Sequence, residues 1–462
     1  MYSNSLSYFT NFNKDFTQSY KVIKLGGTSQ CKIGYDNLIK IFNSCKENKS
    51  DINHIIILSA LSGTTNLLCK FVESKDKKFI TRILDNHYKL LIELKIELDM
   101  IKDIIGYFNI IIEKYISESE YNDIYLKFEI IGFGEKLSTY IFSLYLNINN
   151  IDAKLLNSYE YVKSKKEIYQ CNEPTEFYIN KTFLDDISKN KNYIYILQGF
   201  IASTPDNNKI LLGRGGSDTT GSLFANFLNA IVYEVWTDVN GIYTVDPNVS
   251  SNVSSNAQLI KNIDYELVQE LSAMGAKVMH PLSIQPCAEK NISIIVKNTF
   301  NQESLFGDIN TTITSTINTT DIFIATQKSQ TVFDIKSPDM WNAYGFVYDI
   351  FRRFSEKQVD VNIITTSQFS VSTTTNDTNI YKLYSLRDNL KEKYEINMYS
   401  NCVILSVISH DIKKILNLID YEFLKDELLI IHVGNNNKTI NFVLKNFKNS
   451  YIEKLYSMII TN

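Results

Sequence analysis

The chain has 462 residues, more than one ordinary domain holds, so two or three domains are expected. Hydrophobic residues make up 44% and charged residues 21% of it, a balance typical of globular proteins with sizeable cores. The net charge of −4 at pH 7 excludes an overall basic footprint for nucleic acid or for an anionic membrane surface.

The six cysteines and five histidines are scattered, without the spacing of a disulfide framework or a zinc site. We therefore expect free thiols, no protein-held metal and a cytoplasmic location. No apolar run approaches the roughly 18 residues that a membrane helix needs. Residues 1–20 lack the apolar core of a secretory signal and are expected to form a flexible leader.

The first two thirds of the chain alternate strand-like and helix-like patterns. Strands are predicted at 21–25, 54–59, 194–201, 231–237 and 292–297. The charged region 70–126 has almost no glycine and is expected to be helical. Continuous β-branched runs separated by helices indicate an α/β domain with a mainly parallel sheet covered on both faces.

The composition changes after residue 300, where Thr, Asn and Ser become frequent. We expect a domain over 21–300, a linker over 301–325, and two smaller domains over 326–400 and 401–462. Each smaller domain has a βαββα pattern, which predicts a pair of ferredoxin-like modules that can interleave.

A lysine stands at the end of the first predicted strand, before a glycine pair. Lys24 would lie where ligands gather in parallel sheets, beside backbone that Gly26 and Gly27 keep open. Such a lysine can neutralise phosphate charge, although a solvated lysine in a plain turn fits the local pattern equally well. The sequence does not match a Walker A loop.

The stretch 213–220, GRGGSDTT, leads from an apolar run into a helical pattern. Ser217 or Asp218 is expected near the helix N-terminus, where backbone N–H groups and the helix dipole favour an anion. Arg214 and Asp218 could together hold a zwitterion, because one can pair with a carboxylate and the other with an ammonium group. The pattern suggests a meeting point of a phosphate donor and an amino acid.

Three further segments carry signals of different strength, and the segment 236–247 is the least generic of them. Hydroxyl residues in 59–66 could donate to phosphate, Glu135 could receive an ammonium group, and the polar loop 236–247 suits an adenine or ribose site. Taken alone, the first two are more often ordinary turn and helix-capping chemistry. His280 and Cys287 have no nearby partner in the sequence and are interpreted as structural.

Taken in order, these motifs resemble those of the aspartate kinases, members of the amino-acid kinase superfamily. The matching segments are 24–29, 59–66, 132–139, 197–202, 212–220, 236–247 and 270–300. The resemblance implies a three-layer catalytic domain followed by two βαββαβ ACT domains. It also implies transfer of the ATP γ-phosphoryl group to the side-chain carboxylate of L-aspartate, with Mg²⁺ held mainly through the nucleotide phosphates, in lysine, threonine and methionine synthesis.

The resemblance assigns roles to individual residues. Lys24 would stabilise the transferring phosphoryl group and Asp218 would position Lys24. The implied aspartate-binding residues are Ser59, Thr65, Glu135, Arg214 and Ser217. The implied nucleotide-binding residues are Lys24, Gly26, Gly27, Thr237, Asp238, Tyr243 and Lys277. The implied effector-binding residues are Met340, Gly345, Phe346, Val347, Val361 and Asn362.

Three positions depart from the family pattern. Asn248 stands where the family usually has an arginine near the nucleotide phosphates, which would weaken ATP binding or turnover. Asn362 and Gln368 stand where lysine-inhibited members typically have carboxylates. An amide offers a cation only a neutral hydrogen bond, so we expect weakened or altered inhibition by lysine.

Two other functions remain open at this level: an amino-acid kinase acting on glutamate or acetylglutamate, and a non-catalytic amino-acid sensor. The loop 236–247 and the paired C-terminal modules argue against the first. Lys24, Glu135 and Arg214 argue against the second. A fused homoserine dehydrogenase is not expected, because no further GxGxxG unit follows. A homodimer through the ACT domains, or a tetramer, is expected, with no nucleic-acid or membrane partner.

Overall fold

The computed structural model describes residues 19–48, 51–117, 123–166, 170–171, 174–187, 194–247, 257–276, 279–315, 321–341, 344–434 and 437–460. The chain divides into two compact units. The first runs to Ile242 and also takes in Lys261–Tyr265 and Val278–Ile317. The second contains Tyr243–Ile260, Glu266–Lys277 and the chain from Asn318 onward. No helix within the described ranges is long and apolar enough to cross a membrane.

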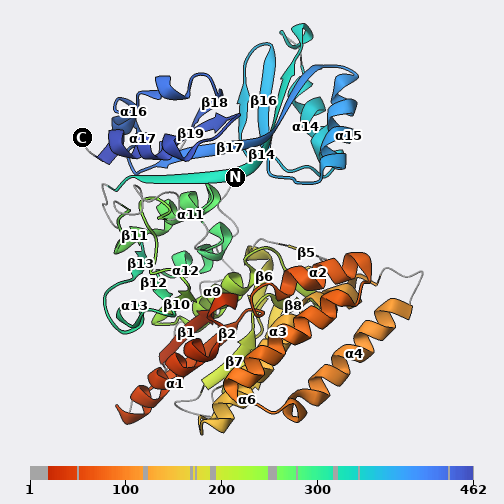
Figure 1. The fold of residues 1–462 in the computed structure, drawn as a ribbon, viewed down its shortest axis with the longest axis vertical. Coiled ribbons are helices and arrows are strands. Elements are labelled where there is room, and N and C mark those ends of the chain that lie inside the picture. Colours follow the sequence, from red (N-terminus) through yellow and green to blue (C-terminus); the bar gives the residue numbers. More distant parts are fainter. Residues whose placement is uncertain are drawn as a thin grey trace. The chain divides into compact units, whose positions relative to one another are not determined.

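An eight-stranded sheet organises the first unit (Figure 1). Its strands, in spatial order, are β11 (Asn262–Asp264), β13 (Thr311–Thr314), β12 (Ile294–Asn298), β10 (Val232–Thr237), β1 (Ser19–Leu25), β2 (Ile52–Leu58), β7 (Ile194–Gln198) and β3 (Ala153–Leu156). All neighbours are parallel except β12 and β13. The predicted mainly parallel sheet is therefore confirmed.

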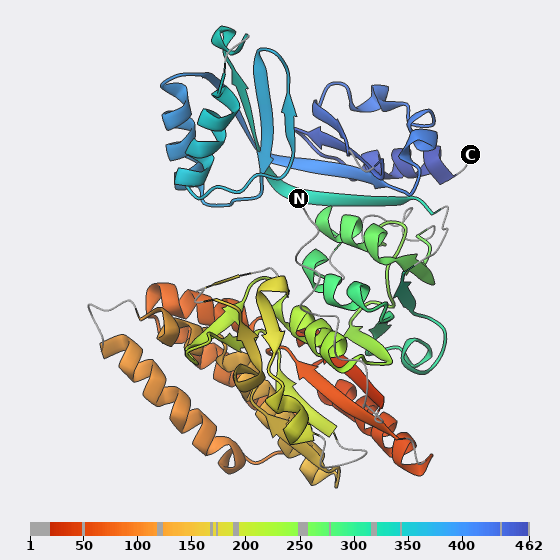
Figure 2. The same ribbon diagram turned by 180° about the vertical axis from the view of Figure 1, so that it is seen from behind.

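Helices cover this sheet because its strands are apolar on both faces. The helices up to α9 are α1 (Lys32–Glu47), α2 (Thr64–Ser74), α3 (Lys78–Leu94), α4 (Lys102–Ser117), α5 (Ile124–Ile131), α6 (Phe133–Ile148), α7 (Ser158–Tyr161), α8 (Thr182–Ile187) and α9 (Gly216–Leu228). Helix α6 contacts β2, β7 and β3, whereas α9 contacts β1, β2 and β10. In Figures 1 and 2, α4 is the outermost of the helices that follow β2.

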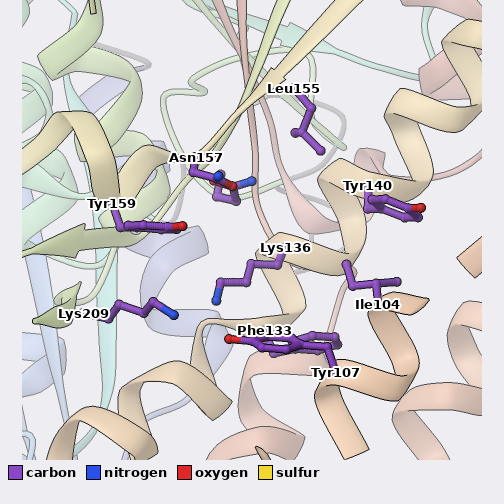
Figure 3. A pocket seen from close by; sticks show the side chains of 10 residues that line it. Ile104, Tyr107, Phe133, Lys136, Tyr140, Leu155, Asn157, Tyr159 and Lys209 are labelled. Carbon is purple, nitrogen blue, oxygen red and sulfur yellow. The ribbon is translucent and has the colours of Figure 1, made fainter. Parts of the chain in front are cut away.

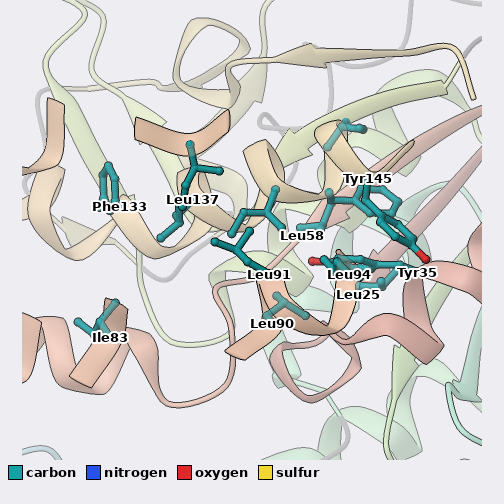
Figure 4. Close-up of a cluster of buried hydrophobic side chains, with 14 of the residues drawn as sticks. Leu25, Tyr35, Leu58, Ile83, Leu90, Leu91, Leu94, Phe133, Leu137 and Tyr145 are labelled. Atoms are coloured by element: carbon teal, nitrogen blue, oxygen red, sulfur yellow. The ribbon is translucent and has the colours of Figure 1, made fainter. Parts of the chain in front are cut away.

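A large buried cluster lies between the sheet and the helices that include α1, α3 and α6 (Figure 4). It joins Leu25 of β1 and Leu58 of β2 to Leu91 of α3, all at most 1% exposed. Tyr35 of α1 contacts Phe142 of α6, with ring centroids 4.6 Å apart. This packing fixes the start of α6 relative to the ends of β1 and β2.

A five-stranded sheet adjoins the first in this unit. Its strands, in spatial order, are β5 (Gln170–Cys171), β9 (Lys209–Leu212), β8 (Ile201–Ser203), β4 (Val162–Ser164) and β6 (Phe177–Ile179). The prediction of one strand over 194–201 is wrong, because β7 ends at Gln198 and β8 begins at Ile201 in the other sheet. The chain changes sheets across Gly199 and Phe200.

The second unit holds a six-stranded antiparallel sheet with the order β15-β16-β14-β17-β19-β18. Its elements are β14 (Phe323–Lys336), α14 (Phe346–Glu356), β15 (Ile364–Thr366), β16 (Ser370–Thr375), α15 (Ile380–Lys391), β17 (Glu395–Ile408), α16 (Ile412–Leu416), β18 (Leu428–Val433), β19 (Thr439–Leu444) and α17 (Asn449–Ile460). Both predicted βαββα patterns are present in this order.

The two modules interleave through their long strands. The first half of β14 pairs with the second half of β17, and the second half of β14 pairs with the first half of β17. The register shifts between Gln327 and Val332, and Ser329 and Asn401 adopt left-handed backbone with φ of 59°. Each long strand therefore supplies a strand to both ferredoxin-like modules.

Three segments of the chain do not follow the predicted domain boundary at residue 300. Val245 pairs with Ile324 and packs in the core of the second module, so Tyr243–Ile260 groups with the second unit. Helix α11 (Tyr265–Ala273) lies mostly in the same unit. The range 301–325 contains α13 (Gln302–Phe306) and β13, which follow α12 (Gln285–Glu289) and β12 in the first unit.

Candidate active site

A buried ion pair joins the end of β1 to the start of α9. Lys24 Nζ lies 2.6 Å from Asp218 Oδ1, and the two side chains are only 11% and 13% exposed. Asp218 is in the first turn of α9, as the helical pattern predicts. At this distance the Asp218 carboxylate can hold the Lys24 ammonium group in place, as the role expected of Asp218 requires.

The loops after β1 and β2 lie directly against one another. A Cβ added to Gly27 would lie 2.7 Å from the carbonyl oxygen of Ala60, so only glycine fits without a backbone shift. The Ser62 N–H donates to the Gly27 carbonyl at 3.2 Å, and the Ser59 N–H donates to the Leu25 carbonyl at 3.2 Å. These contacts hold the hydroxyl-rich 59–66 loop beside the Lys24 end of β1.

Glu135 brings a buried carboxylate to the same edge of the sheet. It lies in the first turn of α6 and is 3% exposed, and its Oε2 has no hydrogen-bond partner. Burial raises the pKa of Glu135 to about 8, although N–H groups of Ala60 and Glu135 itself oppose this. A buried carboxylate without a cation is the group to which a ligand ammonium would bind favourably.

Gly134 explains how α6 approaches the 59–66 loop so closely. A Cβ on Gly134 would lie 2.7 Å from Ala60 Cβ and 2.9 Å from Thr64 Cγ2. Thr64 begins α2 after Gly63, which has a left-handed φ of 80°. Thr65, in the same first turn, is half-buried. The start of α2 and the start of α6 therefore meet at this loop.

The glycine-rich turn before α9 depends on close backbone packing. Gly215 has a left-handed φ of 74°, and a Cβ there would lie 2.2 Å from His280 Cβ. A Cβ on Gly199 would lie 2.5 Å from Ser217 Cβ. Arg214 is exposed on this turn. His280 thus has a packing role against the turn, as its structural interpretation predicts.

A residue within the predicted strand 194–201 has a strained backbone. Phe200 has a φ of 67°, which is a genuine outlier for a bulky residue. The Ile201 N–H donates to the Gly199 carbonyl at 2.7 Å and closes a γ-turn around Phe200. Strain of this kind concentrates at functional sites. The glycine that follows β7 was the one available sequence signal for this turn.

The predicted nucleotide-binding residues fall in different parts of the chain. Thr237 ends β10 and donates to the side chain of Asp238 at 3.2 Å. Tyr243 belongs to the second unit, where it forms a β-bridge with Leu259. Lys277 and Asn248 lie outside the described residues. Among the side chains that are described, no group of three or more His, Cys, Asp or Glu could hold a metal ion.

The predicted effector residues lie in the first ferredoxin-like module. Gly345 has a left-handed φ of 79° and precedes α14, which begins with Phe346 and the exposed Val347. Asn362 donates through Nδ2 to the Gln330 side chain at 3.0 Å. Met340 is only 3% exposed within the module core, and Val361 packs against the same core.

Comparison with known proteins places this arrangement in a family. The model of the amino acid kinase family matches residues 19–298. The chain belongs to this family. The matched range contains the Lys24–Asp218 pair, Glu135 and both glycine-rich turns.

Curated relatives cover most of the chain at low identity. The bifunctional aspartokinase/homoserine dehydrogenase of Buchnera aphidicola is 27% identical over 92% of this chain, which spans 54% of that protein. Aspartokinase 2 of Arabidopsis thaliana is 28% identical over 75% of this chain, which spans 65% of that protein. Lysine-sensitive aspartokinase 3 of Escherichia coli is 26% identical over 85% of this chain and 88% of its own length.

Solved structures share the fold along nearly the whole chain. Aspartokinase III of E. coli in complex with aspartate and ADP has a TM-score of 0.76 at 22% identity. The same protein in complex with lysine and aspartate has a TM-score of 0.74 at 21% identity. Each comparison covers 96% of this chain and 99% of the other.

Proposed function

We propose that this family member is an aspartate kinase, which transfers the γ-phosphoryl group of ATP to the side-chain carboxylate of L-aspartate. The buried, unpartnered Glu135 carboxylate at the same sheet edge as the Lys24–Asp218 pair carries this proposal. The names of the curated relatives and the ligands of the E. coli structure support it.

The chemistry follows from charge placement. Glu135 would bind the aspartate ammonium group, and the exposed Arg214 guanidinium would bind its α-carboxylate through two parallel hydrogen bonds. The side-chain carboxylate of aspartate would then face Lys24. A carboxylate is already nucleophilic, so no strong general base is needed. Catalysis is positioning and electrostatic stabilisation, with Lys24 neutralising charge on the phosphoryl oxygens.

Ser59, Thr65 and Ser217 would add hydrogen bonds to the substrate. Ser217 is held against Gly199, and the Ser59 backbone is tied to Leu25, so both are pre-positioned. Asp218 is a positioning residue, because its carboxylate lies 2.6 Å from Lys24 Nζ and fixes that ammonium group. Thr237 and Asp238 are proposed to bind the nucleotide with Gly26 and Gly27.

We propose ATP with Mg²⁺ as the phosphoryl donor. In this proposal the nucleotide phosphates would carry the Mg²⁺. Bound there, Mg²⁺ would supply neutralisation of phosphate charge.

We further propose that the ferredoxin-like modules are ACT domains that bind an amino-acid effector and form a homodimer, or a tetramer. We keep 21–300 as the proposed catalytic domain and 326–400 and 401–462 as the proposed ACT domains, whereas 301–325 contains α13 and β13 and is not a plain linker. A cytoplasmic location remains a prediction. Asn362 already donates to Gln330 and offers no carboxylate to a cation. Inhibition by lysine should accordingly be weak.

ADP release by the purified chain tests the proposed activity. With ATP and Mg²⁺, aspartate should support turnover at a rate well above that with glutamate or acetylglutamate, because an added methylene moves the acceptor carboxylate out of line. Tight amino-acid binding without any ADP release would instead identify a non-catalytic sensor. Turnover with glutamate above that with aspartate would identify a different amino-acid kinase.

A further inference from the structure

A cavity lies at the carboxyl ends of β3 and β7, beside α6. Its volume is about 230 Å³. It is lined by Ile104, Tyr107, Phe133, Lys136, Tyr140, Leu155, Asn157, Tyr159, Gln198 and Lys209. None of these residues is among those assigned to aspartate or ATP, and the carboxyl ends of parallel strands are where ligands collect.

Two lysines converge in this cavity. Figure 3 shows the ammonium groups of Lys136 and Lys209 between the ring of Tyr159 and the rings of Tyr107 and Phe133. Lys136 Nζ lies 5.7 Å from the Tyr107 ring centroid, and Lys209 Nζ lies 5.3 Å from that of Tyr159. The Lys136 side chain is 15% exposed and that of Lys209 is 28% exposed. The cavity is therefore a partly desolvated cationic site with aromatic walls.

A single carboxylate partners both cations. Glu129 accepts hydrogen bonds from Lys136 at 3.2 Å, from Lys209 and from the Tyr107 hydroxyl. Burial opposes ionisation of Glu129, but these donors lower its pKa to about 2. Burial and the nearby Lys209 lower the pKa of Lys136 to about 8. At neutral pH two positive charges thus face one negative charge.

One other acidic residue is close to this cluster. Glu160 accepts a hydrogen bond from Asn157 at 3.0 Å but is exposed, so water and salt screen its charge. Lys136, Lys209 and Glu129 therefore leave a surplus of one positive charge in the cluster. Placing a positive charge in a desolvated cavity is costly unless an anion accompanies it.

We propose that this cavity binds a small organic anion with one carboxylate and a flat apolar body. The carboxylate would bind between Lys136 and Lys209, and the body would lie among Phe133, Tyr140 and Leu155. A cavity of about 150 Å³ accepts a benzene ring, so 230 Å³ leaves room for a ring and its carboxylate. A divalent anion would exceed the single surplus charge and fits less well.

Binding of benzoate to the full-length chain, measured by calorimetry at pH 7, tests this site. Benzamide has the same shape without the charge and serves as the ligand control. Benzoate should bind saturably and at least about tenfold more tightly than benzamide, because only the anion gains charge-assisted hydrogen bonds. Equal binding of the two, or no binding of benzoate, would overturn the proposal.

Substitutions of the two lysines and of Glu129, with one control variant, locate the binding. Lys136→Met or, if that variant does not fold, Lys209→Met should weaken benzoate binding about tenfold. Glu129→Gln should strengthen it, because the cluster then gains positive charge. Lys89→Met, which removes an exposed lysine on α3, should leave binding unchanged. Benzoate affinity that stays unchanged in the Lys136, Lys209 and Glu129 variants would contradict the assignment. Thermal unfolding checks that each variant is folded. These readouts do not depend on kinase activity.

Discussion

Lys24 Nζ and Asp218 Oδ1 lie 2.6 Å apart and tie the carboxyl end of β1 to the first turn of α9. A lysine ammonium on a flexible stem would otherwise sample many positions. The pair therefore fixes a cation at the sheet edge where Glu135 and the 59–66 loop also lie. Positioning of this cation is the step on which the proposed phosphoryl transfer depends most.

Asp218→Asn should lower kcat for ADP release about 100-fold while changing the KM for aspartate much less, since a mispositioned Lys24 chiefly affects transition-state charge. Asp36→Asn is a suitable control, because Asp36 pairs with the half-exposed Lys32 on α1. Equal activity of the two variants would contradict the positioning role of Asp218.

The raised pKa of Glu135 makes the free energy of unfolding depend on pH when no ligand is bound. Its pKa is 4.5 in an ordinary environment and about 8 in the folded protein. Between these values the folded state keeps a proton that the unfolded state releases, so the free energy of unfolding should fall as pH rises from about 4.5 to 8. Glu135→Gln should remove this component, on the order of a few kcal/mol, and make the chain more stable than the wild type at pH 8.

The same variant should bind aspartate poorly. A neutral amide replaces a charge-assisted partner of the ammonium group, so the KM for aspartate should rise about 10- to 100-fold with little change for ATP. Chemical denaturation across pH 5–8 and steady-state kinetics separate the two effects. A KM that stays at the wild-type value in a folded Glu135→Gln protein would exclude the ammonium-binding role.

Two glycine substitutions should have opposite effects. Gly215→Ala puts a Cβ 2.2 Å from His280 Cβ on left-handed backbone, so we expect a loss of more than about 2 kcal/mol in unfolding free energy, and lower activity. Gly106→Ala lies in α4 with no atom within 4 Å of the new Cβ, and should stabilise the chain by about 0.5–1 kcal/mol. Thermal unfolding of both variants measures the contrast, and a harmless Gly215→Ala would refute the close packing.

Asn362→Asp should increase sensitivity to lysine. A carboxylate at position 362 would offer a charge-assisted bond in place of the present amide contact with Gln330, so half-inhibition should need about tenfold less lysine. Gln368→Glu is the parallel variant. If both variants gave the same lysine-inhibition curve as the wild type, this would argue against an effector site at these positions.

The sequence alone was enough to predict the parallel sheet, because its strands are continuous β-branched runs between helices. It also predicted Asp218 in the first turn of α9, from the helical spacing after the glycine pair. The ion pair with Lys24 could only be expected from the family resemblance, since no local pattern relates residues so far apart in the chain.

Other features depend on tertiary contacts that local patterns do not report. The apolar run 194–201 has the pattern of one strand, but the γ-turn at Phe200 breaks it and carries the chain into a second sheet. Val245 packs in the second unit because of its partner Ile324. The Lys136–Glu129–Lys209 cluster joins the consecutive helices α5 and α6 to β9, and Lys209 lies 80 residues beyond Glu129 in the chain.

Trapping of the product tests the central claim most directly. Hydroxylamine converts an acyl phosphate to a hydroxamate, so incubation with ATP, Mg²⁺ and aspartate should yield aspartyl hydroxamate in step with ADP release. Lys24→Ala should reduce this product at least about 100-fold, whereas Lys32→Ala, at a half-exposed position, should not. Absence of aspartyl hydroxamate from the folded wild-type protein, or its undiminished formation by Lys24→Ala, would contradict the account.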